Sequence, residues 1–158
     1  MSNFQVQQVG VFQVNEEGMF IQLEPQYILA LQGLDGFSHL SVLWWFSDFD
    51  QEEMRQIYET PQPYKGAPEV MGTFATRGPI RPNPLALTTV QIIYVDYEKG
   101  LIQIAYTDAN DGTPVLDIKP YTPSNDRVEN PEVPKWCSDW PMSYETSGEF
   151  DWESVFNF

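Results

Sequence analysis

The sequence predicts an all-β fold, a compact closed β-barrel of short strands with one or two short helices and an irregular carboxy-terminal tail. Short segments rich in β-branched and aromatic residues alternate with turns that contain glycine, proline or asparagine. Only one stretch has helical spacing of its apolar residues, and no internal repeat is found. Many short strands expose many sheet edges, and closing the sheet removes those edges. A barrel is therefore the architecture that we expect.

The chain has the length of one domain with an appendage. Its 158 residues are 42% hydrophobic and 15% aromatic, which is enough for one packed core. Residues 122–158 differ in composition, with eight acidic, two basic and seven aromatic residues and four prolines. We predict a barrel domain over residues 1–121 and an acidic, aromatic tail over residues 122–158. Such a tail is either a docked extension or an interaction segment.

Strands dominate the first part of the chain. Apolar residues alternate imperfectly over Phe4–Val14, which predicts a strand with a break near Gly10. The turn sequence NEEG at residues 15–18 then reverses the chain. Extended segments are expected on either side of Pro25, and LSVLWWF at residues 40–46 has the composition of a buried strand.

The second part contains one helix and the clearest hairpin. Asp50 followed three residues later by Glu53 predicts the start of a short helix at residues 50–58. Two strand-like segments at residues 87–97 and 101–107 flank the turn EKG, which predicts a hairpin. The composition of residues 108–114 is that of a loop.

A last strand is expected at residues 115–121. Alternation along this strand puts Asp117 and Lys119 on one face, with Val115 and Tyr121 in phase with them.

Charge and residue counts exclude several classes of function. The formal net charge of −15 opposes binding of nucleic acid unless the few basic residues are gathered in one place. One cysteine, Cys137, allows no intramolecular disulfide, and with one histidine, His39, no zinc site and no metal are expected. The longest apolar run is far shorter than the roughly 20 residues that span a bilayer. We expect a soluble, cytoplasmic protein without a membrane partner.

Two arginines stand out in the stretch GTFATRGPIRPNPLALTTV, residues 72–90, which has no acidic residue. Three prolines restrict the backbone of this stretch, so that it is predicted as a stiff loop. A stiff loop presents Arg77 and Arg81 to a carboxylate or phosphate with little loss of entropy on binding. The alternative is an internal clamp in which these arginines pair with the protein's own carboxylates.

The stretch DANDGTPVLDIKPY, residues 108–121, concentrates polar groups around a tight turn. Carboxylates and backbone groups of this kind can bind ribose hydroxyls or the edge of adenine. The alternative is ordinary turn chemistry, because Asp-Gly is common in loops. A lone histidine at the start of a strand, such as His39, is more often structural than catalytic, and no nucleophilic triad can be assembled.

Three motifs together resemble the signature blocks of the TsaA-like (TrmO) family. They are LQGLDGFSHL at residues 31–40, GTFATRGPIRPNP at residues 72–84 and DGTPVLDIKPY at residues 111–121. The family contains tRNA methyltransferases that act on N6 of threonylcarbamoylated adenosine at position 37. The resemblance therefore implies a β-barrel, S-adenosyl-L-methionine as cofactor, the tRNA anticodon loop as partner, and a homodimer whose cofactor site is near the subunit interface.

The resemblance also implies which residues form the site. The second block places Arg77, Arg81 and Asn83 at the pocket for cofactor and substrate. The implied cofactor contacts also include the loop after the hairpin and the pair that follows the aromatic strand: Asp108, Ala109, Asn110 and Asp111, with Ser47 and Asp48. In the third block, Asp117, Lys119 and Tyr121 complete the pocket as the candidate catalytic residues.

Two functions of different classes follow. The first is an S-adenosyl-L-methionine-dependent methyltransferase that acts on tRNA or on another methyl acceptor. The second is a non-catalytic relative of the same fold that binds a nucleoside-like small molecule or a protein. The charge of −15 favours the second, because affinity for tRNA depends on basic residues that neutralise phosphates.

Overall fold

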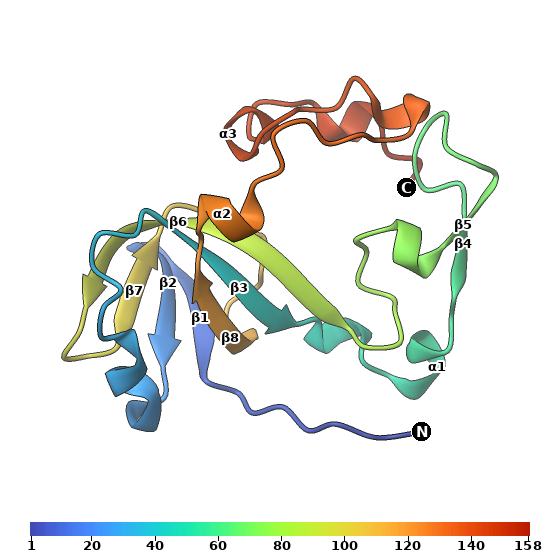
Figure 1. Ribbon diagram of the computed structural model, residues 1–158. Coiled ribbons are helices and arrows are strands. Elements are labelled where there is room, and N and C mark those ends of the chain that lie inside the picture. Colours follow the sequence, from blue (N-terminus) through green and yellow to red (C-terminus); the bar gives the residue numbers. More distant parts are fainter. The chain divides into compact units, whose positions relative to one another are not determined.

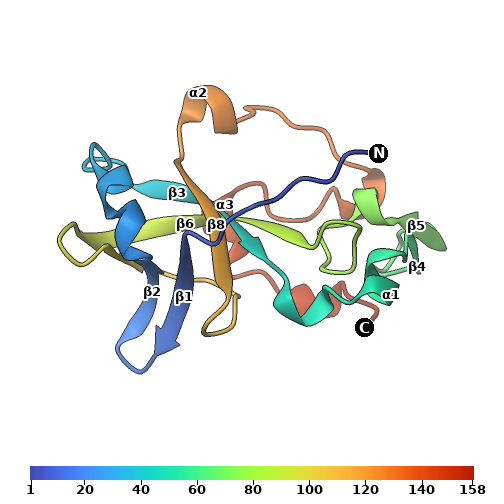
Figure 2. The same cartoon turned by 90° about the horizontal axis from the view of Figure 1, so that it is seen from below.

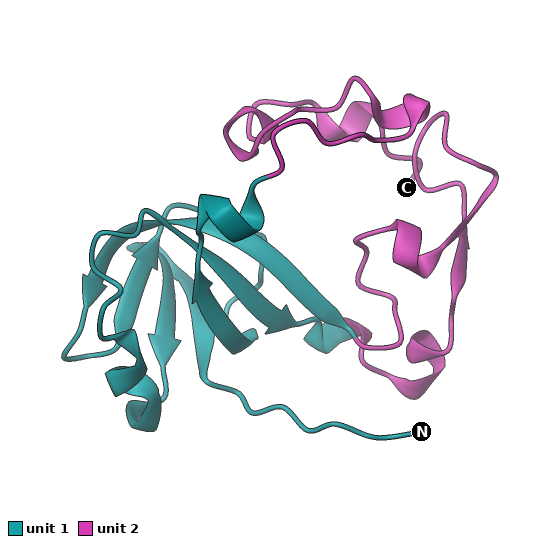
Figure 3. Cartoon of the chain, viewed as in Figure 1, with its two compact units in different colours: residues 1–48, 84–127 teal, residues 49–83, 128–158 magenta.

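The computed structural model describes all 158 residues and divides the chain into two compact units (Figure 3). The first unit contains residues 1–48 and 84–127, and the second contains residues 49–83 and 128–158. Each unit is thus built from two separate parts of the sequence. The predicted domain boundary after residue 121 stays a prediction, and the two units are described separately below.

The first unit is a closed antiparallel barrel, as the sequence predicts (Figures 1 and 2). The strands follow one another around the barrel in the order β1-β2-β7-β6-β3-β8. Their bounds are β1 Gly10–Asn15, β2 Gly18–Leu23, β3 His39–Trp45, β6 Leu85–Asp96, β7 Leu101–Ile104 and β8 Pro114–Pro120. No helix of the chain combines the length and the apolar character that crossing a bilayer requires.

Apolar side chains from every strand fill the barrel. Leu40 and Val42 of β3 are fully buried, and Trp44 is nearly so, while the residues between them are only partly covered. The indole Nε1 of Trp44 donates a hydrogen bond to Thr88 Oγ1 at 2.9 Å. The predicted strand at residues 40–46 is therefore confirmed, with one face in the core and the other outside it.

Two predicted turns are confirmed. Asn15 and Gly18 pair at the end of the β1–β2 hairpin. The β6–β7 hairpin turns at Gly100, which has a positive φ of 65°. A Cβ atom at Gly100 would lie 2.5 Å from Ile28 Cγ1, so this turn needs both the conformation and the small size of glycine.

The structure corrects two expectations for the first 31 residues. The first strand begins at Gly10 and not at Phe4, and residues 1–8 are exposed without regular structure. The segment after Pro25 is not extended, because it forms the 3-10 helix η1 at Pro25–Leu31. Proline suits the first turn of a helix, and the helical conformation lets Leu31 reach the core.

A β-bulge corrects the predicted phase of the last strand. Leu43 of β3 pairs with Asp117, but the next residue, Trp44, pairs with Val115. Val115 is consequently fully buried in the core, whereas Asp117 lies on the outer face of the barrel. The extra residue of the bulge breaks the two-residue alternation on which the prediction rested. A four-residue helix, α2 at Pro123–Asp126, follows β8.

The second unit has little regular structure. Strands β4 (Glu59–Pro61) and β5 (Val70–Gly72) form a two-stranded sheet. The predicted helix after Asp50 is confirmed as α1 at Glu52–Arg55, although it is shorter than expected. The remaining elements are single turns: η2 Ser47–Phe49 at the boundary of the units, η3 Thr73–Ala75, η4 Lys135–Cys137, α3 Tyr144–Ser147 and η5 Trp152–Ser154.

Aromatic rings form the packed centre of the second unit. Tyr64 stacks on Trp136 with ring centroids 5.5 Å apart, and Trp140 packs edge-on against both rings. Trp152 packs against Trp140, and Phe156 packs against Tyr64. Partial burial in this cluster raises the pKa of the Tyr64 phenol.

Backbone hydrogen bonds also hold the end of the chain. The amide of Lys65 donates to Val155 O at 2.9 Å, and the amide of Asn157 donates to Pro63 O at 3.0 Å. The segment after Val128 is thus docked onto residues 62–66, and it supplies most of the rings of the cluster. Of the two roles considered for the tail, this packing favours the docked extension.

We expect Trp140→Ala to lower the free energy of unfolding by about 2–3 kcal/mol, because it removes the ring at the middle of the cluster. Thermal unfolding followed by near-ultraviolet circular dichroism measures the change. Met142→Ala is the control, because Met142 is in the same segment with its side chain 72% exposed. Equal melting temperatures for the two variants would show that the cluster does not stabilise this unit.

Candidate functional site

The loop at residues 107–113 carries four of the predicted cofactor contacts and is tied to strand β1. The carboxylate Oδ1 of Asp111 accepts a hydrogen bond from the amide of Val14 at 2.8 Å. The amide of Gly112 donates to Phe12 O at 2.8 Å, and the amide of Phe12 donates to Thr113 O at 2.9 Å. Asp111 therefore acts as a structural bridge, as the turn interpretation of this loop expects.

The side chain of Ala109 points into the barrel and is 6% exposed. Its amide donates a hydrogen bond to Thr107 Oγ1 at 3.1 Å, and Thr107 is also buried. Because the methyl group belongs to the core, Ala109 can offer a ligand only its backbone. Its neighbours Asp108 and Asn110 are exposed.

The loop meets the residues that follow β3. Asn110 Nδ2 lies 3.5 Å from Asp48 Oδ2, although the two residues are 62 positions apart. Asp48 and Ser47 are both exposed. The fold thus brings together two groups of residues that the resemblance had assigned to the cofactor: Asp48 and the loop at Asp108–Asp111.

The candidate catalytic residues Asp117 and Lys119 lie on β8, at the outer face of the barrel, and Tyr121 directly follows this strand. Lys119 Nζ is 2.8 Å from Asp117 Oδ2, and this hydrogen bond and the opposite charge raise the pKa of Lys119. The amide of Tyr121 donates to His39 O at 2.9 Å, and the two rings pack edge-on with centroids 6.3 Å apart. His39 Nδ1 is also 2.7 Å from Ser38 Oγ. His39 is thus surrounded by partners, as expected of a structural histidine.

Residues 72–83 of the arginine stretch, which carry Arg77 and Arg81, belong to the second unit, whereas residues 85–90 are not a loop as expected but the start of strand β6. The Arg81 side chain folds back so that Nη1 donates to Thr76 O at 3.1 Å and to Gly78 O at 3.0 Å. Both acceptors are backbone carbonyls and neither is a carboxylate, so these contacts stiffen the loop and do not neutralise the charge of Arg81. Arg77 is exposed.

Arg55 is a functional candidate that the sequence interpretation missed. Its Nε donates to Pro82 O at 2.8 Å, and its Nη2 is 3.4 Å from Asn83 Oδ1. The predicted helix already contained Arg55, but nothing in the sequence indicated that this helix would end against the RPNP motif. With Lys65, the three arginines Arg55, Arg77 and Arg81 place four of the chain's eight cationic side chains in the segment 55–83.

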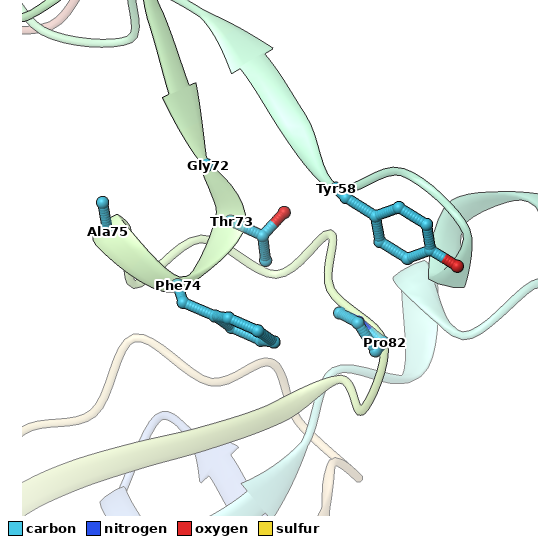
Figure 4. A pocket seen from close by; sticks show the side chains of 6 residues that line it. All are labelled: Tyr58, Gly72, Thr73, Phe74, Ala75 and Pro82. Atoms are coloured by element: carbon cyan, nitrogen blue, oxygen red, sulfur yellow. The ribbon is translucent and has the colours of Figure 1, made fainter.

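A cavity of about 410 Å³ opens beside this stretch, within the second unit (Figure 4). It is lined by Tyr58, Gly72, Thr73, Phe74, Ala75 and Pro82. Five of these six residues belong to the second motif block. Phe74 is 85% exposed, comparable with Phe4 and Phe158, but it is the one of these three that lines a cavity. No sequence pattern had marked Phe74 or Tyr58 as candidate site residues.

The predicted site residues therefore fall into two groups. Those of the first unit lie on one barrel: Ser47, Asp48, Asp108, Ala109, Asn110, Asp111, Asp117, Lys119 and Tyr121. Arg77, Arg81 and Asn83 lie in the second unit. Within these groups the structure pairs Asp48 with Asn110, and Asp117 with Lys119.

Comparison with known proteins gives the family. Residues 6–127 match the model of the tRNA-methyltransferase O N-terminal domain, called TrmO_N. This chain belongs to the TrmO family. All three motif blocks lie inside the matched range, so the resemblance inferred from them is confirmed.

Relatives of two kinds are similar to this TrmO-family chain. An S-adenosyl-L-methionine-binding protein of Archaeoglobus fulgidus is 34% identical over 112 residues, which are 71% of this chain and 75% of the relative. The tRNA (adenine(37)-N6)-methyltransferase of Escherichia coli is 32% identical over 142 residues, which cover 78% of this chain and 60% of the enzyme.

This chain is also similar to solved structures of TrmO. The crystal structure of TrmO from Pseudomonas aeruginosa superposes with a TM-score of 0.62 and 26% identity, over 83% of this chain and 62% of that chain. The TrmO-family chain thus spans about three fifths of the length of the E. coli enzyme and of the P. aeruginosa structure.

We expect Asp111→Ala to loosen the loop at residues 107–113 locally. Losing the hydrogen bond to the Val14 amide costs about 1 kcal/mol at an exposed site, so amide exchange at Val14 accelerates about fivefold. Hydrogen exchange followed by NMR measures this rate. Asp35→Ala is the control, because Asp35 is exposed in the same unit. An unchanged exchange rate at Val14 would show that Asp111 does not fasten the loop.

Proposed function

We propose that this TrmO-family protein is a cytoplasmic S-adenosyl-L-methionine-dependent methyltransferase that acts on N6 of the modified adenosine at position 37 of tRNA. The observation that carries this proposal is the family match over residues 6–127, which includes all three motif blocks. The E. coli relative is named for the same reaction, and the A. fulgidus relative is named for binding the same cofactor.

The polar cluster of the first unit suits the cofactor. The ribose hydroxyls of S-adenosyl-L-methionine can donate hydrogen bonds to carboxylates. Its sulfonium and ammonium groups are cationic and are also attracted to carboxylates. Asp48 and Asn110 approach each other at one end of the barrel, and Asp108 is exposed on the same loop. We propose that Asp48, Asp108 and Asn110 contact the cofactor with their side chains, and that Ala109 contributes only backbone groups.

The reaction makes modest demands on acid–base chemistry. When bound, the cofactor would supply a methyl group from its sulfonium to the acceptor nitrogen, and the proton of that nitrogen would be released to solvent after the transfer. Because the nitrogen would react while neutral, alignment of the two groups would contribute more to the rate than a strong base does.

We propose that Asp117, Lys119 and Tyr121 orient the acceptor, and that Arg77, Arg81 and Asn83 bind anionic groups of cofactor or substrate. The paired charges of Asp117 and Lys119 can accept and donate hydrogen bonds at the same time. Arg81 donates hydrogen bonds to two backbone carbonyls of its own loop. These neutral acceptors do not cancel the charge of the guanidinium, which can therefore still attract an anion.

A second candidate function is binding of S-adenosyl-L-methionine without methyl transfer. Two observations favour it: the net charge of −15 and the archaeal relative that is named only for binding. A methylation assay on tRNA that carries the threonylcarbamoyl modification, with radiolabelled cofactor, separates the two. Cofactor binding without transfer to this tRNA supports the second candidate.

We expect the protein to bind S-adenosyl-L-methionine, and Asp108→Asn to weaken the binding by about 1 kcal/mol, because a charge-assisted hydrogen bond becomes a neutral one. Isothermal titration calorimetry measures both affinities. Asp35→Asn removes the same charge from another exposed loop and is the control. Absence of binding to the wild-type protein at millimolar cofactor would contradict both candidate functions.

We also propose that the protein is a homodimer, as the family resemblance implies. Strand β6 exposes the apolar residues Leu85, Leu87 and Ile93, which are 38–55% exposed, and apolar surface of this kind gains free energy when a second copy covers it. We expect a dimer in sedimentation equilibrium at micromolar concentration, and a weaker dimer for Ile93→Lys. A monomeric wild-type protein would overturn the proposal.

A further inference from the structure

The cavity of the second unit has the geometry of a slot beside an exposed ring. Figure 4 shows the Phe74 side chain pointing toward Pro82, with Thr73 at the base of the space between them and Tyr58 at its edge. Its walls are therefore a phenyl ring, a pyrrolidine ring and small side chains. A flat, largely apolar group fits such a slot better than a flexible or strongly hydrated one.

The turn that carries Phe74 is rigidly held. The amide of Thr73 donates to Tyr58 O at 2.8 Å, and Thr73 Oγ1 donates to Ile57 O at 3.3 Å. On the other side of the turn, Thr76 Oγ1 donates to Thr73 O at 2.9 Å. Because the scaffold is already fixed, an aromatic side chain on it loses little conformational entropy when a ligand binds. Phe74 is thus an exposed ring on a backbone turn that is held in place.

The opposite wall is linked to positive charge. Arg55 Nε donates to Pro82 O at 2.8 Å, so a guanidinium contacts the residue that forms this wall. Arg77 and Arg81 belong to the same loop as Pro82, and the chain has no acidic residue between Glu69 and Asp96. In a protein with a net charge of −15, this segment is a local exception.

We propose that Phe74 and Pro82 bind one unpaired nucleobase of an RNA strand between them. The arginine loop, which is the loop that carries Arg77 and Arg81, binds the adjoining phosphate. An aromatic face that stacks on a base and a nearby guanidinium that pairs with a phosphate are the two elements of single-strand recognition. The identity of that RNA as the methyl acceptor rests on the proposed function. Binding of the strand itself does not depend on it.

Charge separates this ligand from the cofactor. Both contain an adenine, but S-adenosyl-L-methionine carries two cationic groups and one carboxylate, whereas an RNA strand carries one negative charge per nucleotide. A loop that contains two arginines and no acid favours the phosphate. The net negative charge of the protein repels RNA in general, but the arginines of this loop attract it locally.

The decisive experiment compares Phe74→Leu with Phe4→Leu in the full chain. Both substitutions replace a highly exposed phenyl ring by an aliphatic side chain of similar bulk, but only the first lies at the cavity. The probe is fluorescein-labelled single-stranded oligoadenylate, measured by fluorescence anisotropy. Loss of stacking weakens binding about tenfold for Phe74→Leu, and Phe4→Leu binds as the wild type does. Equal melting temperatures check that both variants fold.

The other outcomes are equally informative. Wild-type protein that fails to bind oligoadenylate, or Phe74→Leu that binds it unchanged, overturns the nucleobase slot. Phe74→Leu that loses S-adenosyl-L-methionine in calorimetry to the same degree assigns the cavity to the cofactor, which also overturns the slot. Cofactor binding by the wild type tests the proposed function separately, so one hypothesis can fail while the other stands.

Salt dependence tests the phosphate contact. The slope of log K against log salt concentration falls by about one for Arg77→Gln if Arg77 contacts one phosphate. Lys135→Gln, an exposed cation of the same unit outside the arginine loop, is the control and leaves the slope unchanged. An unchanged slope for Arg77→Gln removes Arg77 from the proposed site.

Discussion

Closure of the barrel between β1 and β8 is the contact on which the candidate residues of the first unit depend. The ladder pairs only Gly10 with Val115 and Val11 with Pro114, and hydrogen bonds from the amides of Val9 and Phe12 extend it. Gly10 makes the adjoining approach to β2 possible, because a Cβ atom there would overlap the backbone of Gln22. The same closure holds the loop at residues 107–113 against β1 and thereby brings Asn110 beside Asp48.

The second unit is stabilised differently from the barrel, because its two-stranded sheet is too small to enclose a core. Stacked and edge-on rings from residues 136–156 and Tyr64 supply the packing, and backbone hydrogen bonds to residues 63–65 fasten the end of the chain. Arginine side chains complete the unit by binding carbonyls. Arg81 holds the loop from Thr76 to Gly78, and Arg55 holds Pro82. The charged residues of the motif are thus structural supports and ligand candidates at once.

These two constructions suit the proposed methyl transfer, which depends on alignment. In such a reaction the protein contributes mainly by holding groups in place, and both the Asp111 bridge and the arginine contacts limit local motion. Acidic groups gather at the barrel loop and cationic groups gather at the second motif. A cationic cofactor and an anionic acceptor would therefore be drawn to different parts of the chain.

Much of the chain could be interpreted from the sequence because its signals are local. β-Branched and aromatic composition predicted the barrel strands, glycine and asparagine predicted the β1–β2 and β6–β7 turns, and three motifs were sufficient to indicate the family. Only the tertiary structure decided that Val115 turns inward, because a bulge depends on the partner strand. It alone placed Asn110 beside Asp48, assigned Arg55 to Pro82 and left Phe74 exposed. Each of these depends on contacts between residues far apart in the sequence, and such contacts leave no periodic pattern in the residues themselves.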